Sequence, residues 1–179
     1  MNAVLNAAIV GLGRWGQNLV NAVQGKSAHI CFVRAVVRNP EPLREYASKN
    51  NIELTADFAA ALADPRIQAI VLATPHSLHA EQIIAVAAAG KPVYCEKPLT
   101  LKRVDAQRAV DACKKAGVVL AVGHDKRFWS SMQALARIVA SGELGEILHI
   151  EGHNSNETSR TSFASWRASP EESPGGGMT

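Results

Sequence analysis

The chain has 179 residues, of which 47% are hydrophobic, enough for one well-buried domain with a small appendage and too little for two full domains. Its 19 lysine and arginine residues against 16 aspartate and glutamate residues give a formal net charge of +3 without a long basic cluster, which argues against nucleic acid as the main partner. No apolar run approaches the roughly 18 residues of a membrane span, and the N-terminus lacks the basic lead-in of a signal peptide. Three cysteines, odd in number and far apart, are typical of reduced thiols, so we expect a cytoplasmic protein with no membrane partner.

Short apolar runs alternate with helical patterns, which is typical of βαβ units and a parallel sheet. In chain order we expect a strand at 6–13, a helix at 15–24, a strand at 29–37, a helix at 40–50, a short helix within 55–65, a strand at 67–74, a helix at 77–90, a strand at 92–98, a helix at 100–117 capped by Thr100, and a strand at 118–124. The last three strands count as the fourth, fifth and sixth of the sheet. The pattern predicts an α/β fold, a doubly wound parallel sheet of the Rossmann type, over residues 1–124.

The remainder, residues 125–179, has a different pattern. We expect a connecting helix from residue 130 that ends at Gly142, and an alternating, half-buried strand at 146–154. A single strand cannot satisfy its backbone alone, so this strand is expected to belong to a sheet that lies mostly beyond the chain. The segment is interpreted as the start of an incomplete α+β substrate domain, in which residues 147–179 are disordered or pair with the edge of another copy.

A glycine motif, "GLGRWG", follows the first strand directly and opens the first helix. In such a G-x-G-x-x-G motif Gly11 permits a tight turn, Gly13 lets the backbone approach a pyrophosphate, and Gly16 allows close packing of the helix. Arg14 and Trp15 lie in the same loop. The motif predicts a dinucleotide site, and the alternative is a merely tight turn.

The end of the second strand decides which dinucleotide is expected. An NAD enzyme places an acid there, on the ribose hydroxyls, whereas this corner contains Arg38 and Asn39. A guanidinium can bind a 2′-phosphate through two hydrogen bonds. We therefore expect NADP, with NAD as the alternative and with a solvated turn as the alternative role of Arg38.

Polar residues also follow the three later strands, at the edge where ligands bind in an open α/β sheet. They are Thr74, Pro75, His76 and His79 after the fourth strand, Glu96 and Lys97 after the fifth, and Arg127 after the sixth. The two histidines are three residues apart, but no third ligand has a suitable spacing, so no metal site is expected.

Five motifs in order, "VGLGRWG", "ATPHSLHAE", "CEKPLT", "GHDKRF" and "GELGEI", resemble those of the glucose-fructose oxidoreductase/inositol dehydrogenase/rhizopine-catabolism family, called Gfo/Idh/MocA. The resemblance extends from about residue 5 to residue 179 and covers about the first half of a family member. The corner at Arg38 departs from the family pattern, because it lacks the common acid, and this leaves the cofactor choice open.

The resemblance implies roles for individual residues. Lys97 matches a lysine near the nicotinamide that orients substrate and tunes the acid–base group, and Glu96 matches an acid that contacts the nicotinamide-side ribose. The loop with Thr74, Pro75, His76 and His79 matches one that passes along the cofactor, and Arg127 matches an arginine beside the interdomain cleft. The alternatives are that His79 caps the following helix and that Lys97 is an ordinary turn lysine.

The resemblance also implies an activity, hydride transfer between a nicotinamide and a hydroxyl-bearing carbon of a sugar or cyclitol. The catalytic Asp and His of the family follow a glycine stretch that resembles residues 175–177, and the chain ends at Thr179. We therefore expect this chain alone to bind the cofactor without useful turnover. The alternatives are a non-catalytic NADP(H)-binding module and, more weakly, a redox-sensing regulator. Family members associate through the outer face of the substrate-domain sheet, which leaves a homo-oligomer open.

Overall fold

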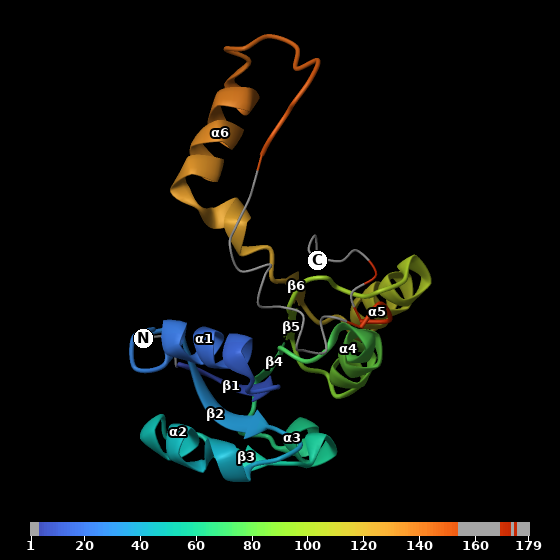
Figure 1. Ribbon diagram of the computed structural model, residues 1–179. Coiled ribbons are helices and arrows are strands. Elements are labelled where there is room, and N and C mark those ends of the chain that lie inside the picture. Colours follow the sequence, from blue (N-terminus) through green and yellow to red (C-terminus); the bar gives the residue numbers. More distant parts are fainter. Residues whose placement is uncertain (1–3, 154–168, 173, 175–179) are drawn as a thin grey trace.

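The computed structural model describes residues 4–153, 169–172 and 174, and these form a six-stranded parallel sheet with helices on both sides (Figure 1). The strand order is β3-β2-β1-β4-β5-β6, which is the order of a doubly wound Rossmann sheet and confirms the predicted fold. The strands are β1(Leu5–Val10), β2(Ile30–Val36), β3(Glu53–Thr55), β4(Ala69–Leu72), β5(Val93–Cys95) and β6(Leu120–Val122). The α-helices are α1(Arg14–Val23), α2(Arg44–Lys49), α3(Phe58–Ala63), α4(His79–Ala88), α5(Arg103–Ala116) and α6(Ser130–Ser141). Short 3₁₀ helices occur at η1(Glu41–Leu43), η2(His76–Leu78) and η3(Asp125–Phe128).

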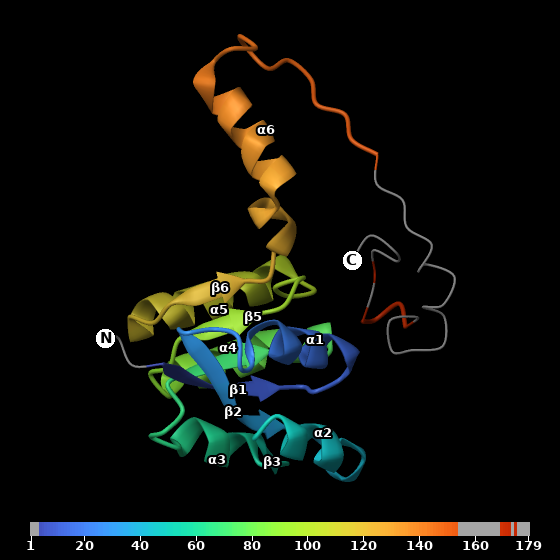
Figure 2. The same cartoon turned by 90° about the vertical axis from the view of Figure 1, so that its left-hand side faces the viewer.

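The central strand β1 is buried on both faces of the sheet. Because successive side chains of a strand point to opposite sides, β1 contributes to two separate apolar clusters. Ala7 and Ile9 pack with residues of α1 and α2, whereas Ala8 and Val10 pack with residues of α3, α4 and α5. Figure 1 shows α1 and α2 on one side of the sheet and α3, α4 and α5 on the other, and Figure 2 looks onto the side of α1 and α2. Burial on both faces explains why residues 7–10 of the strand form a continuous apolar run rather than an alternating one.

Most observed strands and helices are shorter than the sequence pattern predicts, although α1 has the predicted ten residues, and one capping residue was predicted wrongly. The helix expected at 100–117 begins at Arg103, and its N-cap is Lys102, which makes no side-chain capping bond. The Thr100 hydroxyl instead donates to the carbonyl oxygen of Lys102, 2.8 Å away. Strand β3 has only three residues, and the sequence pattern assigned no residues to it.

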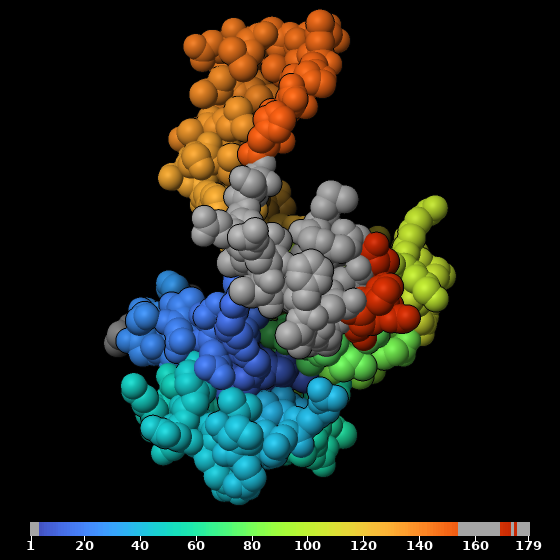
Figure 3. Space-filling model, viewed as in Figure 1, coloured from blue at the N-terminus to red at the C-terminus, as the bar shows by residue number. Residues whose placement is uncertain are grey.

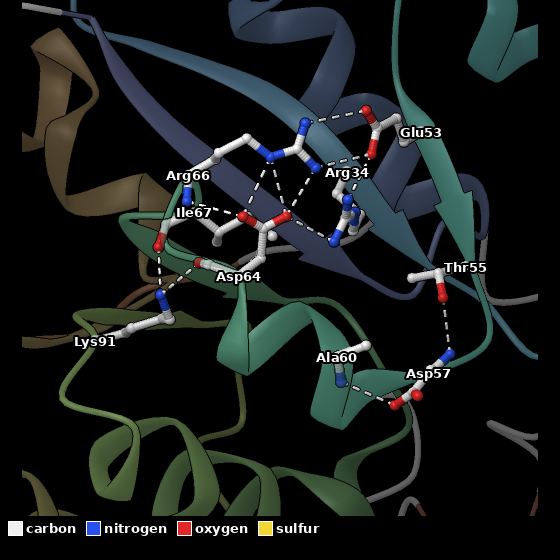
Figure 4. A network of polar contacts seen from close by, with 9 residues as sticks. All are labelled: Arg34, Glu53, Thr55, Asp57, Ala60, Asp64, Arg66, Ile67 and Lys91. Atoms are coloured by element: carbon white, nitrogen blue, oxygen red, sulfur yellow. Dashed lines mark hydrogen bonds and ion pairs between the residues drawn. The ribbon is translucent and has the colours of Figure 1, made fainter.

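An ion-pair network holds the edge strand β3 and the connection from α3 to β4 against β2 (Figure 4). Arg34 of β2 pairs with Glu53 of β3, and its second nitrogen lies 2.9 Å from the Asp64 carboxylate, whose side chain is 11% exposed. Arg66 binds the same two acids, at 2.8 Å from Asp64 and 3.3 Å from Glu53. The Lys91 ammonium donates to the carbonyl oxygen of Asp64, 3.0 Å away. Hydrogen bonds from Arg66 lower the pKa of Asp64 to about 2.

The helix α6 stands away from the sheet and its helices in both cartoon views and in the space-filling view (Figure 3). It ends as predicted at Gly142, whose left-handed backbone has a φ of 75°, and it has no buried residue. The strand predicted at 146–154 does not form in residues 146–153, where Leu148 and Ile150 are 86% and 74% exposed. In the described part of the chain no strand lies beside this segment, so its backbone has nothing to pair with. The predictions for residues 154–168, 173 and 175–179 lie outside the described residues. Among the helices that the structure describes, none has the length and apolarity to cross a membrane.

Candidate functional site

The glycine loop connects β1 to α1 at the carboxyl edge of the sheet, and each of its glycines has a different environment. Gly11 has a φ of +91°, and a Cβ atom there would lie 2.6 Å from the carbonyl oxygen of Ala73. A Cβ atom at Gly16 would lie 2.1 Å from the carbonyl oxygen of Gly11. A Cβ atom at Gly13, in contrast, would meet none of the described residues within 4 Å. The first and third glycines are therefore required by the turn and its packing, and the second faces open space.

The N-terminus of α1 is free to receive an anion. Its N-cap, Gly13, has no side chain to cap the helix, and no acidic residue lies in the first turn. The first amide groups of a helix lack partners within the helix and carry its positive dipole end. Arg14 and Trp15 of this turn are exposed. A diphosphate fits this arrangement, because Gly13 leaves room for it and the helix supplies donors.

Residues Arg38 and Asn39 lie just beyond the end of β2, and both are exposed. The amide of the preceding residue, Val37, donates to the carbonyl oxygen of Thr55 in β3, which ties the corner to the sheet. The Asn39 side chain accepts from the amide of Glu41 at 3.3 Å and so supports the turn into η1. Within the described residues the Arg38 guanidinium has no hydrogen bond or ion pair, which leaves all its donors available to a ligand.

The loop after β4 contains Thr74, Pro75 and His76. The Thr74 hydroxyl donates to Oε1 of Gln82 in α4 at 2.6 Å, and His76 is only 5% exposed. The backbone of this loop is adjacent to the glycine loop, since a Cβ atom at Gly11 would lie 3.2 Å from the Thr74 nitrogen. The structure thus brings the loops after β1 and β4 together.

The imidazole of His79 connects the loop after β4 to the loop after β5. Its side chain is fully buried; Nδ1 lies 2.9 Å from the carbonyl oxygen of Pro98, and Nε2 lies 3.0 Å from that of Thr74. A neutral imidazole carries one N–H and can donate to only one of these oxygens, whereas a doubly protonated ring donates to both. The buried ring of His79 thus connects the loop after β4 with the loop after β5, and we call this contact the His79 brace. Direct contact of His79 with a cofactor stays a prediction.

Residues 169–172 lie against η2, the 3₁₀ helix that precedes α4, a contact that the sequence did not predict. The Glu172 carboxylate accepts from the Ser77 amide at 3.0 Å and from the Ser77 hydroxyl, and its carbonyl oxygen lies 2.7 Å from Nδ1 of His76. Burial raises the pKa of Glu172, but the hydrogen bonds from Ser77 and the charges of His76 and His79 outweigh it, and the net pKa is lowered. This segment therefore covers part of the His76 side chain.

An acidic residue, Glu96, and a basic residue, Lys97, follow the end of β5. Glu96 is only 7% exposed, whereas Lys97 is exposed. Oε1 of Glu96 accepts from the Tyr94 hydroxyl at 3.0 Å, and Oε2 accepts from the Lys97 amide at 3.3 Å. A Cβ atom at Gly123, just after β6, would lie 2.8 Å from Oε1 of Glu96. Sequence reasoning missed Tyr94 and Gly123, and the only signal of their roles is their alternation with Glu96 in paired strands.

Arg127 lies in η3, after β6, and it is exposed. Its guanidinium is 6.0 Å from the ring of Phe128, and in the described part of the chain it makes no ion pair or hydrogen bond with the other candidate residues. The structure therefore does not bring Arg127 into contact with Glu96 or Lys97. No group of three or more His, Cys, Asp or Glu side chains that could hold a metal ion occurs within residues 4–153 and the described residues after them.

Residues 5–124 match the profile of the Gfo/Idh/MocA oxidoreductases, a family with an NAD-binding Rossmann fold. The chain is 31% identical over 173 residues to a 2,7-anhydro-N-acetylneuraminate hydratase of Escherichia coli, covering 96% of this chain and 45% of the relative. It is 32% identical over 161 residues to a scyllo-inositol 2-dehydrogenase (NAD(+)) of Bacillus subtilis, covering 85% of this chain and 45% of the relative. The chain thus spans about half the length of the curated relatives it matches.

Two solved structures are similar over large parts of the chain. A crystal structure described as a putative NADPH-dependent oxidoreductase from Desulfitobacterium hafniense has a TM-score of 0.88 at 29% identity, covering 100% of this chain and 52% of that one. The WlbA dehydrogenase from Bordetella pertussis, in complex with NADH and UDP-GlcNAcA, has a TM-score of 0.77 at 31% identity, covering 82% and 42%. With the profile match spanning β1 to the end of β6, the chain belongs to the Gfo/Idh/MocA oxidoreductase family, and residues 5–124 are its NAD-binding Rossmann part.

Proposed function

We propose that the chain is the cofactor-binding part of an NAD(P)-dependent oxidoreductase that moves a hydride between a nicotinamide and a hydroxyl-bearing carbon of a sugar or cyclitol. The observation that carries this proposal is the glycine loop. Gly11 and Gly16 are required by the fold itself, whereas a Cβ atom at Gly13 would have no neighbour within 4 Å in the part of the chain that the structure describes. Because Gly13 has no side chain, a ligand such as a diphosphate can approach the backbone of the loop closely.

The strand order supports an orientation for the dinucleotide. In a doubly wound sheet the two halves bind the two mononucleotides on either side of the point where the strand order reverses, here between β1 and β4. The diphosphate lies at the N-terminus of α1, and the adenosine half lies toward Arg38 beyond β2. The nicotinamide half then lies beyond β4 and β5, near Thr74 and the Glu96 carboxylate. Arg14, Trp15, Pro75, His76, His79 and Arg127 are proposed as further cofactor-side residues.

Lys97 is the proposed catalytic residue of this chain. The nicotinamide, when bound, accepts or gives the hydride, and a neighbouring group takes the hydroxyl proton as the hydride leaves. Lys97 is exposed beyond β5, and its ammonium has no hydrogen-bond or ion-pair partner among the residues described. Its three N–H groups are free to orient a substrate hydroxyl and to lower the pKa of the group that takes the proton.

NADP is the proposed cofactor, with NAD as the alternative. The exposed Arg38 guanidinium stands where an NAD enzyme has an acid, and it can hold a 2′-phosphate through two hydrogen bonds. Among the similar proteins, the one from Desulfitobacterium hafniense is described as NADPH-dependent, whereas the one from Bordetella pertussis holds NADH. The choice therefore rests on Arg38.

A second candidate reaction is the addition or removal of water. It is favoured by the hydratase of Escherichia coli, which aligns with 96% of the chain. A hydratase that uses a nicotinamide must return the hydride it removes, so the absorbance of the nicotinamide is unchanged after turnover. A non-catalytic NADP(H)-binding module remains the alternative outside catalysis. We place the protein in the cytoplasm, in keeping with the unpaired thiols of Cys31, Cys95 and Cys113.

Calorimetric titration of the 179-residue chain with NADP⁺ and NAD⁺ at fixed salt tests the proposal. We expect binding of NADP⁺, and we expect Arg38→Asp to weaken it by about tenfold to a hundredfold, because a charge-assisted contact is lost. Binding of NAD⁺ by the same variant should not weaken. Failure of the wild-type chain to bind either nucleotide overturns the proposal, and equal loss for both nucleotides overturns the NADP preference.

Turnover is tested separately. Within the described residues no acid–base side chain contacts the Lys97 ammonium, so we expect the chain alone to bind cofactor without sustained reduction of NADP⁺ by sugars or cyclitols. Steady production of NADPH from such a substrate by the purified chain contradicts this expectation. Addition of the same substrate to a protein that carries the catalytic Asp and His of the family serves as the positive control.

A further inference from the structure

Tyr94 and Glu96 lie on the same face of the sheet, because residues two apart on a strand point to the same side. Tyr94 packs in the apolar cluster that contains β1 and α1 side chains, and its hydroxyl reaches Oε1 of Glu96 at 3.0 Å. Its backbone is held on both sides, since Tyr94 is in register with Val71 of β4 and with Ala121 of β6. The phenol is therefore a fixed donor at the base of the Glu96 side chain.

Gly123 is the third residue at this position; we call Tyr94 and Gly123, which surround the Glu96 carboxylate, the seat of that carboxylate. The register of β5 and β6 pairs Cys95 with Val122, so Gly123 follows opposite Glu96, and its amide donates to the Cys95 carbonyl oxygen at 2.8 Å. A Cβ atom at Gly123 would lie 2.7 Å from the Tyr94 hydroxyl and 2.8 Å from Oε1 of Glu96. The absence of a side chain at Gly123, just after β6, is what allows the hydroxyl and the carboxylate to meet there.

The negative charge of Glu96 decides which group donates in the hydrogen bond between the Tyr94 hydroxyl and the Glu96 carboxylate. Burial raises the pKa of Tyr94, and the negative charge of Glu96 raises it further, so the phenol keeps its proton and donates. The Glu96 carboxylate is therefore the acceptor. It receives one hydrogen bond at Oε1 and one at Oε2, from the Lys97 amide, while a carboxylate has about four acceptor positions. At least one remains for a hydroxyl of a ligand.

We propose that Tyr94 is a positioning residue for the cofactor: it holds the Glu96 carboxylate so that a free lone pair accepts a hydrogen bond from a hydroxyl of the nicotinamide-side ribose. The inference rests on the proposed function, because it needs the nicotinamide half to lie beyond β5. Tyr94 touches the carboxylate and not the cofactor. Its contribution should therefore appear only with ligands that carry the second ribose.

The test compares Tyr94→Phe with Tyr46→Phe, the other tyrosine of the chain. Tyr46 packs against the same apolar cluster as Tyr94, but its hydroxyl donates to Asn21 Oδ1 of α1 at 2.9 Å and not to Glu96, so its variant controls for the loss of a phenolic hydroxyl. Each protein is titrated with NADP⁺ or NAD⁺, whichever the wild-type chain binds more tightly. It is also titrated with the adenine-side fragment, adenosine 2′,5′-bisphosphate or ADP, which lacks the nicotinamide and its ribose.

We expect Tyr94→Phe to weaken the dinucleotide by about tenfold and to leave the fragment unchanged, because a fixed acceptor becomes mobile. Tyr46→Phe should leave both unchanged. In a Glu96→Ala background, the Tyr94→Phe change should have little further effect, since it acts through Glu96. Equal weakening of both ligands, no weakening of either, or full additivity with Glu96→Ala overturns the inference. If the wild-type chain binds neither ligand, the proposed function fails instead.

Discussion

The carbonyl oxygen of Gly11 lies so close to the backbone of Gly16 that a methyl group at Gly16 would be 2.1 Å from it. The start of α1 can therefore approach the end of β1 only because Gly16 has no side chain. Gly13, between them, has no such neighbour. The three glycines of one motif thus have separable roles in stability and in binding.

The first prediction separates these roles by alanine substitution. Gly16→Ala should destabilise the fold by about 1–3 kcal/mol or more, as overpacking against backbone does. Gly13→Ala should leave stability within about 0.5 kcal/mol of wild type but weaken dinucleotide binding, because the methyl group occupies the space proposed for the diphosphate. Urea unfolding and calorimetry measure the two effects. A Gly13→Ala chain that binds as tightly as wild type would count against the site.

The second prediction concerns the brace made by His79. His79→Ala removes the ring that contacts the carbonyl oxygens of Thr74 and Pro98, of which a neutral imidazole donates to one, and creates a buried cavity, so we expect a loss of about 2–4 kcal/mol in the free energy of unfolding. His124→Ala, at an exposed position, is the control and should change little. Chemical unfolding of both variants measures the difference. Similar midpoints for the two would show that the brace contributes nothing.

The third prediction is a pH dependence of stability from Asp64. Its pKa in the folded chain is lowered to about 2, below the ordinary value, so the charged carboxylate stabilises the fold above about pH 4, and this contribution is lost as the pH falls toward 2. Asp64→Asn should therefore be less stable than wild type at neutral pH, and the difference should shrink between about pH 4 and 2. Thermal unfolding across this range measures it. A difference that is independent of pH would assign the loss to something other than charge.

The fourth prediction tests the seat of Glu96 from the opposite strand. Gly123→Ala should displace the Tyr94 hydroxyl and the Glu96 carboxylate, and we expect weaker dinucleotide binding by about tenfold. Gly152→Ala is the matched control, because a Cβ atom at Gly152 meets nothing within 4 Å and its φ is not positive. Calorimetric titration compares the two variants. Unchanged binding by Gly123→Ala would mean that the carboxylate accommodates the methyl group.

Particular elements show how far sequence reasoning extends. Residues 7–10 of β1 and the whole of β4 are continuous apolar runs, so their burial and their place in a parallel sheet are predictable. Strand β3 has only three residues, Glu53–Thr55, and its pairing with β2 gives it a strand conformation that its own pattern does not indicate. The segment 146–153 alternates like a strand and is not one, because no strand lies beside it in the residues that the structure describes.

Some residues of the candidate site are likewise predictable from the sequence, and others are not. The spacing of Gly11, Gly13 and Gly16 after a strand predicts the nucleotide loop, because turn, approach and packing are all local requirements of the backbone. The strand ends also predict Glu96 and Lys97 as candidates.

What the sequence by itself determined is therefore the order of the longer helices and strands of the Rossmann part, without β3, together with the glycine loop and the set of polar residues at the carboxyl ends of the strands, because these follow from local patterns and short spacings. Only the tertiary structure decided that His79 braces two loops, that Tyr94 and Gly123 seat the Glu96 carboxylate, and that Glu172 contacts Ser77. Those contacts join residues from different strands and from distant segments, and such distances depend on how the whole chain packs.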